Sequence, residues 1–225
     1  YNGSESFPKG GRWGFFPSVS LAWIVSNEDF LKGNNNLNNL KVRGSYGLTG
    51  NDNIGANRRY MWLEDYINFS SYYFGTTSTS IATIGEGQIA DSSITWEKQK
   101  QLNIGLEATL FNHVDVSFDY FNQDRYDILA QPYRTIPSFL GISNVGLGTI
   151  FPQSNVGKVK NKGIEAMIRY RSSNTGDLQY YIQADAWYAK NEIVYNAEAL
   201  QLNTYLYRTG RPVNQPFMLE AIGFF

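Results

Sequence analysis

The sequence has 225 residues, of which 42% are hydrophobic and only 17% are charged, with a formal net charge of −1. This balance provides no basic surface for nucleic acid, and the absence of cysteine excludes disulfides, thiolate metal sites and cysteine nucleophiles. Aromatic residues make up 16% of the chain, which suits many strands with aromatic girdles and does not suit a disordered chain.

The first predicted element is a strand over residues 15–25. Its longest apolar run, from Leu21 to Val25, is far shorter than the ~20 residues that a membrane-spanning helix needs, so any membrane crossing would be made by strands. Pro17 lacks an amide donor, and regular strand pairing is expected only after it. Because no signal peptide is visible at Tyr1, we expect the chain to be a piece of a longer precursor.

Apolar and polar residues then alternate with a period of two, which is the signature of a strand with two different faces. The alternation runs from Leu40 to Thr49 and from Leu102 to Leu110. It returns in three further runs, Val114–Tyr120, Ile164–Tyr170 and Tyr180–Tyr188. Charged residues inside the runs all fall on the polar face, which the sequence predicts to line a water-filled lumen: Lys41, Arg43, Glu107, Asp115, Asp119, Glu165, Arg169 and Asp185.

Two architectures explain such strands. In a soluble β-sandwich the apolar faces pack on a second sheet, whereas in a membrane barrel they face lipid. The longest runs approach the ~9–11 residues of a tilted transmembrane strand. Between the runs, short and long connections alternate, with the long ones at residues 51–95 and 122–155. We therefore predict an all-β antiparallel meander in a large transmembrane β-barrel, with short periplasmic turns and long extracellular loops.

The residues give little support for catalysis. The single histidine, His113, lies in a predicted turn between two strands, and the usual nucleophile–base pairs and zinc ligand sets cannot be assembled without cysteine or more histidine. We predict no enzyme activity, no cofactor and no metal site. The mid-strand carboxylates share their face with basic residues, so a polar barrel lining explains them better than acid–base chemistry does.

Binding is the more plausible role of the first long loop. Exposed aromatic rings can stack on sugar rings or on a partner protein, although Tyr and Trp also concentrate at the bilayer interface. The candidate contact residues are Tyr60, Trp62, Tyr66, Tyr72 and Tyr73. The second long loop, which contains Pro132, Pro137 and Pro152, is expected to cover the barrel mouth or to contact a lipoprotein.

Four segments in order resemble motifs of the SusC/RagA transporters. They are GFFPSVSLAW (14–23), LKVRGSYGLTGN (40–51), WEKQKQLNIGLEATLFN (96–112) with VSFDYFNQDRYDIL (116–129), and NVGKVKNKGIE (155–165). One departure is visible, because the Asn-Pro-x-Leu that often precedes the Trp-Glu pair in this family is replaced here by Asp91, Ser92, Ser93 and Ile94.

The resemblance implies a barrel of about 22 strands with an N-terminal plug, energised by TonB and capped by a SusD-like surface lipoprotein. It also implies import of oligosaccharides or peptides across the outer membrane of a Gram-negative cell. Residues 1–225 would then form about six or seven wall strands, with neither the plug nor the barrel-closing C-terminal strand. The remaining alternatives are a TonB-dependent siderophore or cobalamin receptor and a soluble β-sandwich binding module.

Overall fold

The structure, a computed structural model, describes residues 1–54, 59–76, 78–130, 153–172, 178–218 and 223. Its main feature is one antiparallel sheet of six strands in the order β10-β9-β8-β7-β4-β3. The strands are β3 (Ser18–Ile24), β4 (Leu37–Asn51), β7 (Glu97–Leu110), β8 (Val114–Ala130), β9 (Ser154–Arg171) and β10 (Tyr181–Tyr195). The predicted antiparallel all-β meander is confirmed.

Four further strands lie outside this sheet. β1 (Asn2–Gly3) pairs with β2 (Trp13–Gly14), and β5 (Tyr66–Phe74) pairs with β6 (Thr79–Glu86). The described helices are the 3₁₀ turns η1 (Val25–Asn27) and η4 (Thr204–Leu206). Neither of these two is long or apolar enough to cross a bilayer.

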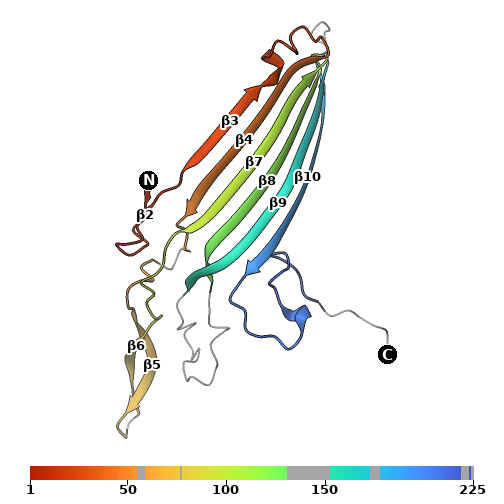
Figure 1. The fold of residues 1–225 in the computed structure, drawn as a ribbon. Coiled ribbons are helices and arrows are strands. Elements are labelled where there is room, and N and C mark those ends of the chain that lie inside the picture. The colour runs from red at the N-terminus through yellow and green to blue at the C-terminus, as the bar shows by residue number, and fades with distance from the viewer. Residues whose placement is uncertain (55–58, 77, 131–152, 173–177, 219–222, 224–225) are drawn as a thin grey trace.

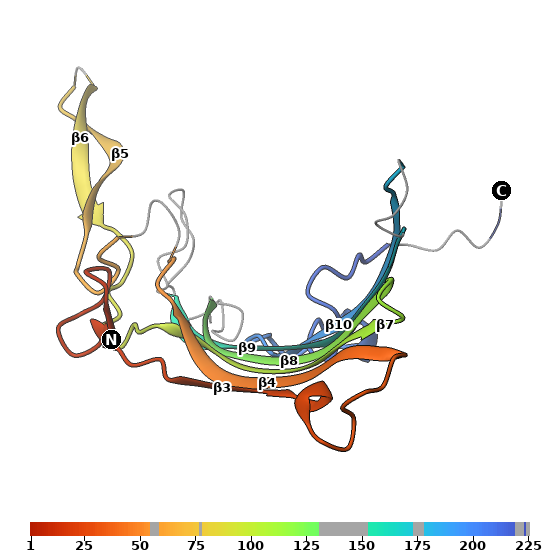
Figure 2. The ribbon, with the colours of Figure 1, turned by 90° about the horizontal axis from the view of Figure 1, so that it is seen from above.

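The six-stranded sheet is curved into a trough, with one convex and one concave face (Figures 1 and 2). The shorter connections, at residues 25–36, 111–113 and 172–180, lie at one end of the sheet. The connections at 52–96 and 131–153 leave the opposite end, where the β5–β6 hairpin projects beyond the sheet (Figure 1). The alternation of short and long connections therefore separates the two ends of the wall.

The strand register places the alternating residues on opposite faces of the sheet. Val42, Leu106, Phe118 and Ala166 are direct cross-strand neighbours on one face. The next row on the other face is Arg43, Gly105, Asp119 and Glu165. A one-residue slip at any pair would move that strand's charges to the apolar face, so the register itself keeps the charged residues and the apolar residues on opposite faces.

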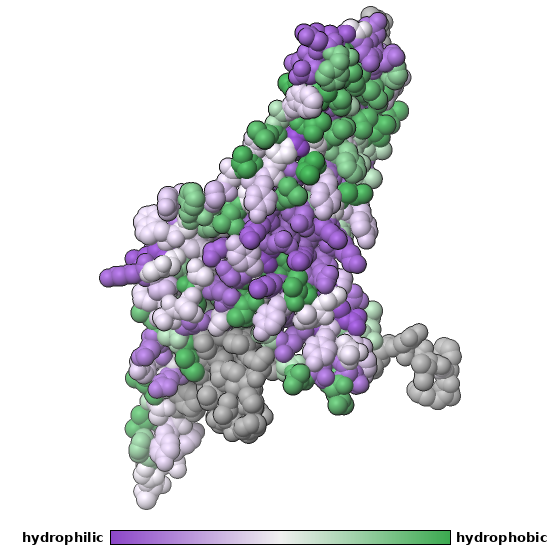
Figure 3. Space-filling view, in the orientation of Figure 1, coloured by the Kyte–Doolittle hydropathy of each residue, from purple (hydrophilic) through white to green (hydrophobic). Residues whose placement is uncertain are grey.

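The apolar residues lie on the convex face and are uncovered. Leu21 is 78% exposed, Ile182 67% and Ile168 51%, and a hydrophobic band crosses the outer face near the end with the short turns (Figure 3). The sandwich alternative requires a second sheet over this face. Within the described residues no second layer packs there, since the six-stranded sheet pairs only along its own strands.

Strand ends follow the sequence pattern where one face is apolar and depart from it elsewhere. β3 begins at Ser18, directly after Pro17 as predicted. β8 extends to Ala130 and β10 to Tyr195, well past Tyr120 and Tyr188, where the alternation ends. Beyond those residues both faces carry polar side chains, so the period-two signal is lost although the hydrogen-bonded ladder continues.

The buried core is small and lies at the end with the long connections. Phe7, Met61, Ile94 and Trp96 form it, and the Phe7 and Trp96 ring centroids are 5.3 Å apart. Ile94 is only 1% exposed. The Asp91–Ile94 segment, which departs from the family pattern, therefore anchors the first long connection against the wall.

Candidate functional site

The concave face carries a connected set of ion pairs from three adjacent strands. Arg43 on β4 donates from Nε to Glu107 Oε1 at 2.9 Å and from Nη2 to both oxygens of Asp119 at 2.6 and 2.8 Å. Lys41 Nζ lies 3.2 Å from the second oxygen of Glu107. The two-residue spacing along each strand keeps all four side chains on one face, so one guanidinium joins three strands.

The other predicted lining residues continue this face without joining the same network. Glu165 is the cross-strand neighbour of Asp119. Arg169 Nε donates to Gln183 Oε1 at 2.7 Å, and Gln183 Nε2 donates to Asp185 at 2.8 and 2.9 Å. The structure thus links Arg169 to Asp185 through an amide rather than by a direct ion pair.

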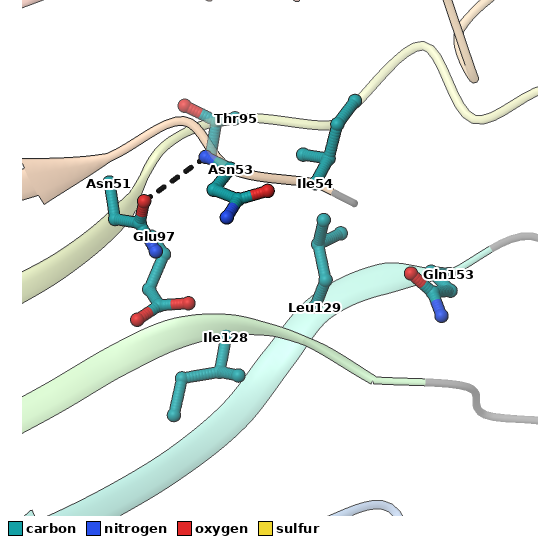
Figure 4. Close-up of a pocket in the computed structure, with 8 residues that line it drawn as sticks. All are labelled: Asn51, Asn53, Ile54, Thr95, Glu97, Ile128, Leu129 and Gln153. Atoms are coloured by element: carbon teal, nitrogen blue, oxygen red, sulfur yellow. Dashed lines mark hydrogen bonds between the residues drawn. The ribbon is translucent and has the colours of Figure 1, made fainter. Parts of the chain in front are cut away.

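A pocket of about 330 Å³ opens where β4, β7 and β8 meet the long connections. Its wall combines side-chain amides and a carboxylate with aliphatic groups (Figure 4), and the Asn53 backbone N–H donates to Asn51 Oδ1 at 3.1 Å. Such a surface can hydrogen-bond hydroxyl or amide groups while it contacts apolar ones. The lining residues are Asn51, Asn53, Ile54, Thr95, Glu97, Ile128, Leu129 and Gln153.

Two side chains hold the rim of this pocket together by hydrogen bonds. Asn155, at the start of β9, donates to the carbonyls of Thr95 and Asp127 at 2.8 and 2.7 Å and accepts from the Thr95 amide at 2.9 Å. These three hydrogen bonds explain why the Asn-Val-Gly segment begins with an amide side chain. They tie the end of the first long connection to β8 and β9.

Asp91 is the second of these side chains. Partial burial raises the pKa of Asp91, but hydrogen bonds from the Ser93 hydroxyl, the Ser93 amide and the Ser154 hydroxyl outweigh that effect and hold the pKa below its ordinary value. The Ser154 hydroxyl lies 2.9 Å from Asp91 Oδ2. The carboxylate therefore joins the loop to the first residue of β9 in its ionised form.

The predicted aromatic contact residues do not form a single platform. Tyr60 and Trp62 precede β5 and lie edge to face with ring centroids 6.4 Å apart. Tyr66, Tyr72 and Tyr73 belong to β5, and all three are more than 60% exposed. Tyr72 contacts Phe74 at 4.9 Å between centroids, whereas Tyr73, the adjacent residue, points to the opposite face of the hairpin.

Several polar contacts were not predicted from the sequence. Lys98 Nζ lies 3.1 Å from Asp127 and Arg171 Nη2 lies 2.9 Å from Asp115. The first pair depends on an irregularity in β8 after Arg125, where Asp127 has a φ of 56°. No periodic pattern signals such a bulge. The second long loop, with Pro132, Pro137 and Pro152, lies outside the described residues.

Comparison with known proteins places this wall in a family. The family model for the TonB dependent receptor-like β-barrel matches residues 1–218. The chain belongs to this TonB-dependent receptor β-barrel family. Among curated relatives of the barrel, TonB-dependent receptor P3 of Formosa agariphila is 32% identical over 86% of the chain, and TonB-dependent receptor SusC of Bacteroides thetaiotaomicron is 30% identical over 86%. The resemblance to SusC/RagA transporters is confirmed.

Solved structures support the barrel wall independently. The RagAB peptide importer in its closed-closed state superposes with a TM-score of 0.71 over 93% of the chain, at 24% sequence identity. This TonB-dependent receptor barrel segment spans 18% of the length of the P3 and SusC relatives and 22% of the superposed structure. These named relatives are receptors and an importer, which agrees with the prediction that the chain is not an enzyme.

Proposed function

We propose that this chain forms part of the wall of an outer-membrane transporter that imports oligosaccharides or peptides with energy from TonB. The observation that carries the proposal is the two-sided sheet, which is apolar and uncovered on its convex face and charged on its concave face. Such a wall separates lipid from an aqueous lumen.

The orientation follows from the two ends of the wall. In outer-membrane barrels the short turns face the periplasm and the long connections face the outside. The 52–96 and 131–153 connections would then meet cargo and a SusD-like lipoprotein, while the concave ion pairs face the lumen. Exposed tyrosines on the β5–β6 hairpin suit stacking against sugar rings or a partner protein.

The rim pocket supports the choice of cargo class. Its amides match the hydroxyl groups of sugars and the backbone groups of peptides. The RagAB structure is named as a peptide importer, and the SusC relative is named as a TonB-dependent receptor. We therefore propose hydroxyl- or amide-rich cargo rather than an iron chelate.

Uptake by cells tests this function. Cells that produce the full-length protein should take up labelled oligosaccharides or peptides, and the uptake should disappear when TonB is deleted. Deletion of a SusD-like surface lipoprotein, to be identified by co-purification with the full-length transporter, should reduce uptake strongly. Uptake of a labelled siderophore or cobalamin instead, with neither oligosaccharide nor peptide imported, would overturn the proposed cargo and support the alternative receptor class.

A further inference from the structure

The outer face of the wall changes character abruptly along β9. Ile164, Ile168 and Tyr170 continue the apolar convex face, and Lys162, the next outward position in the direction of the long connections, is charged. Lys160 and Lys158 follow on the same face, and all three lysines are exposed. At ~3.4 Å per strand residue, the three ammonium groups are distributed over about 14 Å of the strand.

The change occurs on neighbouring strands at a similar level. The continuous apolar stretch of the outward face ends at Tyr120 on β8, Ile164 on β9 and Tyr188 on β10, which are cross-strand neighbours. The next row is Asn122, Lys162 and Lys190. Figure 3 shows the result as a hydrophilic patch between the hydrophobic band and the long connections.

The charges in this patch are not balanced evenly. One row alternates, with Asp124 between Lys100 and Lys160 and with Glu192 beside Lys160. The row next to the apolar band has Lys162 directly opposite Lys190 and no carboxylate. Neither lysine has an ion-pair partner in the part of the chain that the structure describes.

Like charges directly opposite each other destabilise a sheet, so the Lys162–Lys190 pair has a cost that an anion would remove. In the proposed orientation, this pair lies next to Ile164 and Tyr188 at the edge of the apolar face, at the level of lipid headgroups on the outer side of the membrane. Lysines near a membrane surface attract anionic lipid with about 1 kcal/mol each. Tyr188 is 65% exposed beside the pair, as an interfacial aromatic residue would be.

We propose that Lys162 and Lys190 bind a phosphate group of an outer-leaflet lipid, with the acyl chains lying along the apolar band below. This inference rests on the proposed membrane orientation. The partner is a phosphorylated lipid, because the ammonium groups adjoin a hydrocarbon-facing surface. Lys100 and Lys160 stand farther from the band and already face carboxylates, so they contribute less.

The test uses the full-length transporter in detergent micelles and diphosphoryl lipid A. The variant Lys162→Gln/Lys190→Gln should bind this lipid on the order of tenfold more weakly than the parent protein. Lys162→Arg/Lys190→Arg should retain binding, because the charge is kept. The matched control Lys100→Gln/Lys160→Gln removes the same charge from the same face and should weaken binding by only about twofold.

Dephosphorylated lipid A completes the experiment. All variants should bind it equally, and a loss of its binding in the Lys162→Gln/Lys190→Gln protein would overturn the phosphate assignment. Unchanged binding of diphosphoryl lipid A by the Lys162→Gln/Lys190→Gln protein, or equal losses of binding in both glutamine variants, would also overturn the proposal. An acidic protein would then replace the lipid as the candidate partner of the two lysines. Cargo uptake measured with the same variants is expected to stay at the parent level, so failure of lipid binding is distinguished from failure of the proposed transport function.

Discussion

At the scale of single residues, Arg43 holds together carboxylates from two neighbouring strands. Arg43→Ala leaves Glu107 and Asp119 without their shared cation, and the two carboxylates then repel each other. Because Arg43 is 38% exposed, we expect a loss of only about 1–2 kcal/mol in the free energy of unfolding. Thermal unfolding of the full-length barrel in micelles measures this loss.

Two further variants separate charge from geometry. Arg43→Lys keeps the charge but cannot form the bidentate contact with Asp119, so an intermediate loss is expected. Arg43→Ala combined with Asp119→Asn removes the repulsion and should recover part of the stability. If the double variant loses more free energy of unfolding than the two single variants lose together, the result would contradict this account of the network.

Asp91 gives the rim a dependence on pH. Its folded pKa is lower than the ordinary value of 3.8, so the carboxylate contributes stability that is fully present above that value and is lost as the pH falls through the lowered folded pKa. The protection factor of the Ser93 amide in hydrogen exchange should therefore fall on acidification, because this amide donates to the Asp91 carboxylate at 2.8 Å.

The matched control is Asp91→Asn. Its amide keeps an acceptor oxygen but cannot ionise, so protection at Ser93 should be lower near neutral pH and should not change with acidification. If the Ser93 amide of the parent protein stays fully protected from hydrogen exchange down to about pH 2, ionisation of the Asp91 carboxylate does not hold this segment in place.

At the scale of elements, the glycine at position 163 determines how closely β9 packs. A Cβ placed on Gly163 would overlap the Tyr188 carbonyl oxygen and the Phe121 ring. Gly163→Ala should therefore disrupt pairing along β8, β9 and β10 and cost about 1–3 kcal/mol. Urea unfolding of the full-length barrel in lipid vesicles, followed by tryptophan fluorescence, measures the change.

Gly44 on β4 provides the matched control. A Cβ there would come no closer than 4.0 Å to the Asn103 carbonyl oxygen, so Gly44→Ala should change stability by less than about 0.5 kcal/mol. Equal effects of the two alanine substitutions would show that general strand propensity, rather than close packing at Gly163, determines the loss.

The sequence predicts those elements whose two faces meet different solvents. Alternation identified the apolar and charged faces of β4, β7, β8, β9 and β10 because hydrocarbon and water select different side chains. It did not identify the β5–β6 hairpin, whose aromatic and hydroxyl-rich strands are exposed on both faces. It also could not reveal contacts such as Asn155 with Thr95, which depend on where distant segments meet.

At the scale of the whole molecule, adjacent residues of β8 test the two-sided wall. Val116 lies on the convex face and Ser117 on the concave face, opposite Glu107. Val116→Lys should cost about 2–4 kcal/mol, because its ammonium group would enter the lipid. Ser117→Lys should change stability little, since its ammonium group meets water and a carboxylate.

Folding of the full-length barrel variants into vesicles compares the two lysines directly. The same residue type is introduced one position apart, so differences in strand propensity are minimal. Similar losses of stability at both positions would indicate that the convex face does not contact hydrocarbon. That result would contradict the proposed transporter function.

The turn between β7 and β8 has a consequence for how the wall assembles. Phe111 and Asn112 both have positive φ, 53° and 61°, and the His113 amide bonds the Leu110 carbonyl at 3.0 Å. This is the geometry of a type I′ turn, whose twist matches that of its strands. Joining β7 to β8 therefore has the smallest loop-closure entropy of any neighbouring strand pair in the sheet. We expect this hairpin to form first and to serve as the template on which β4 and β9 then align.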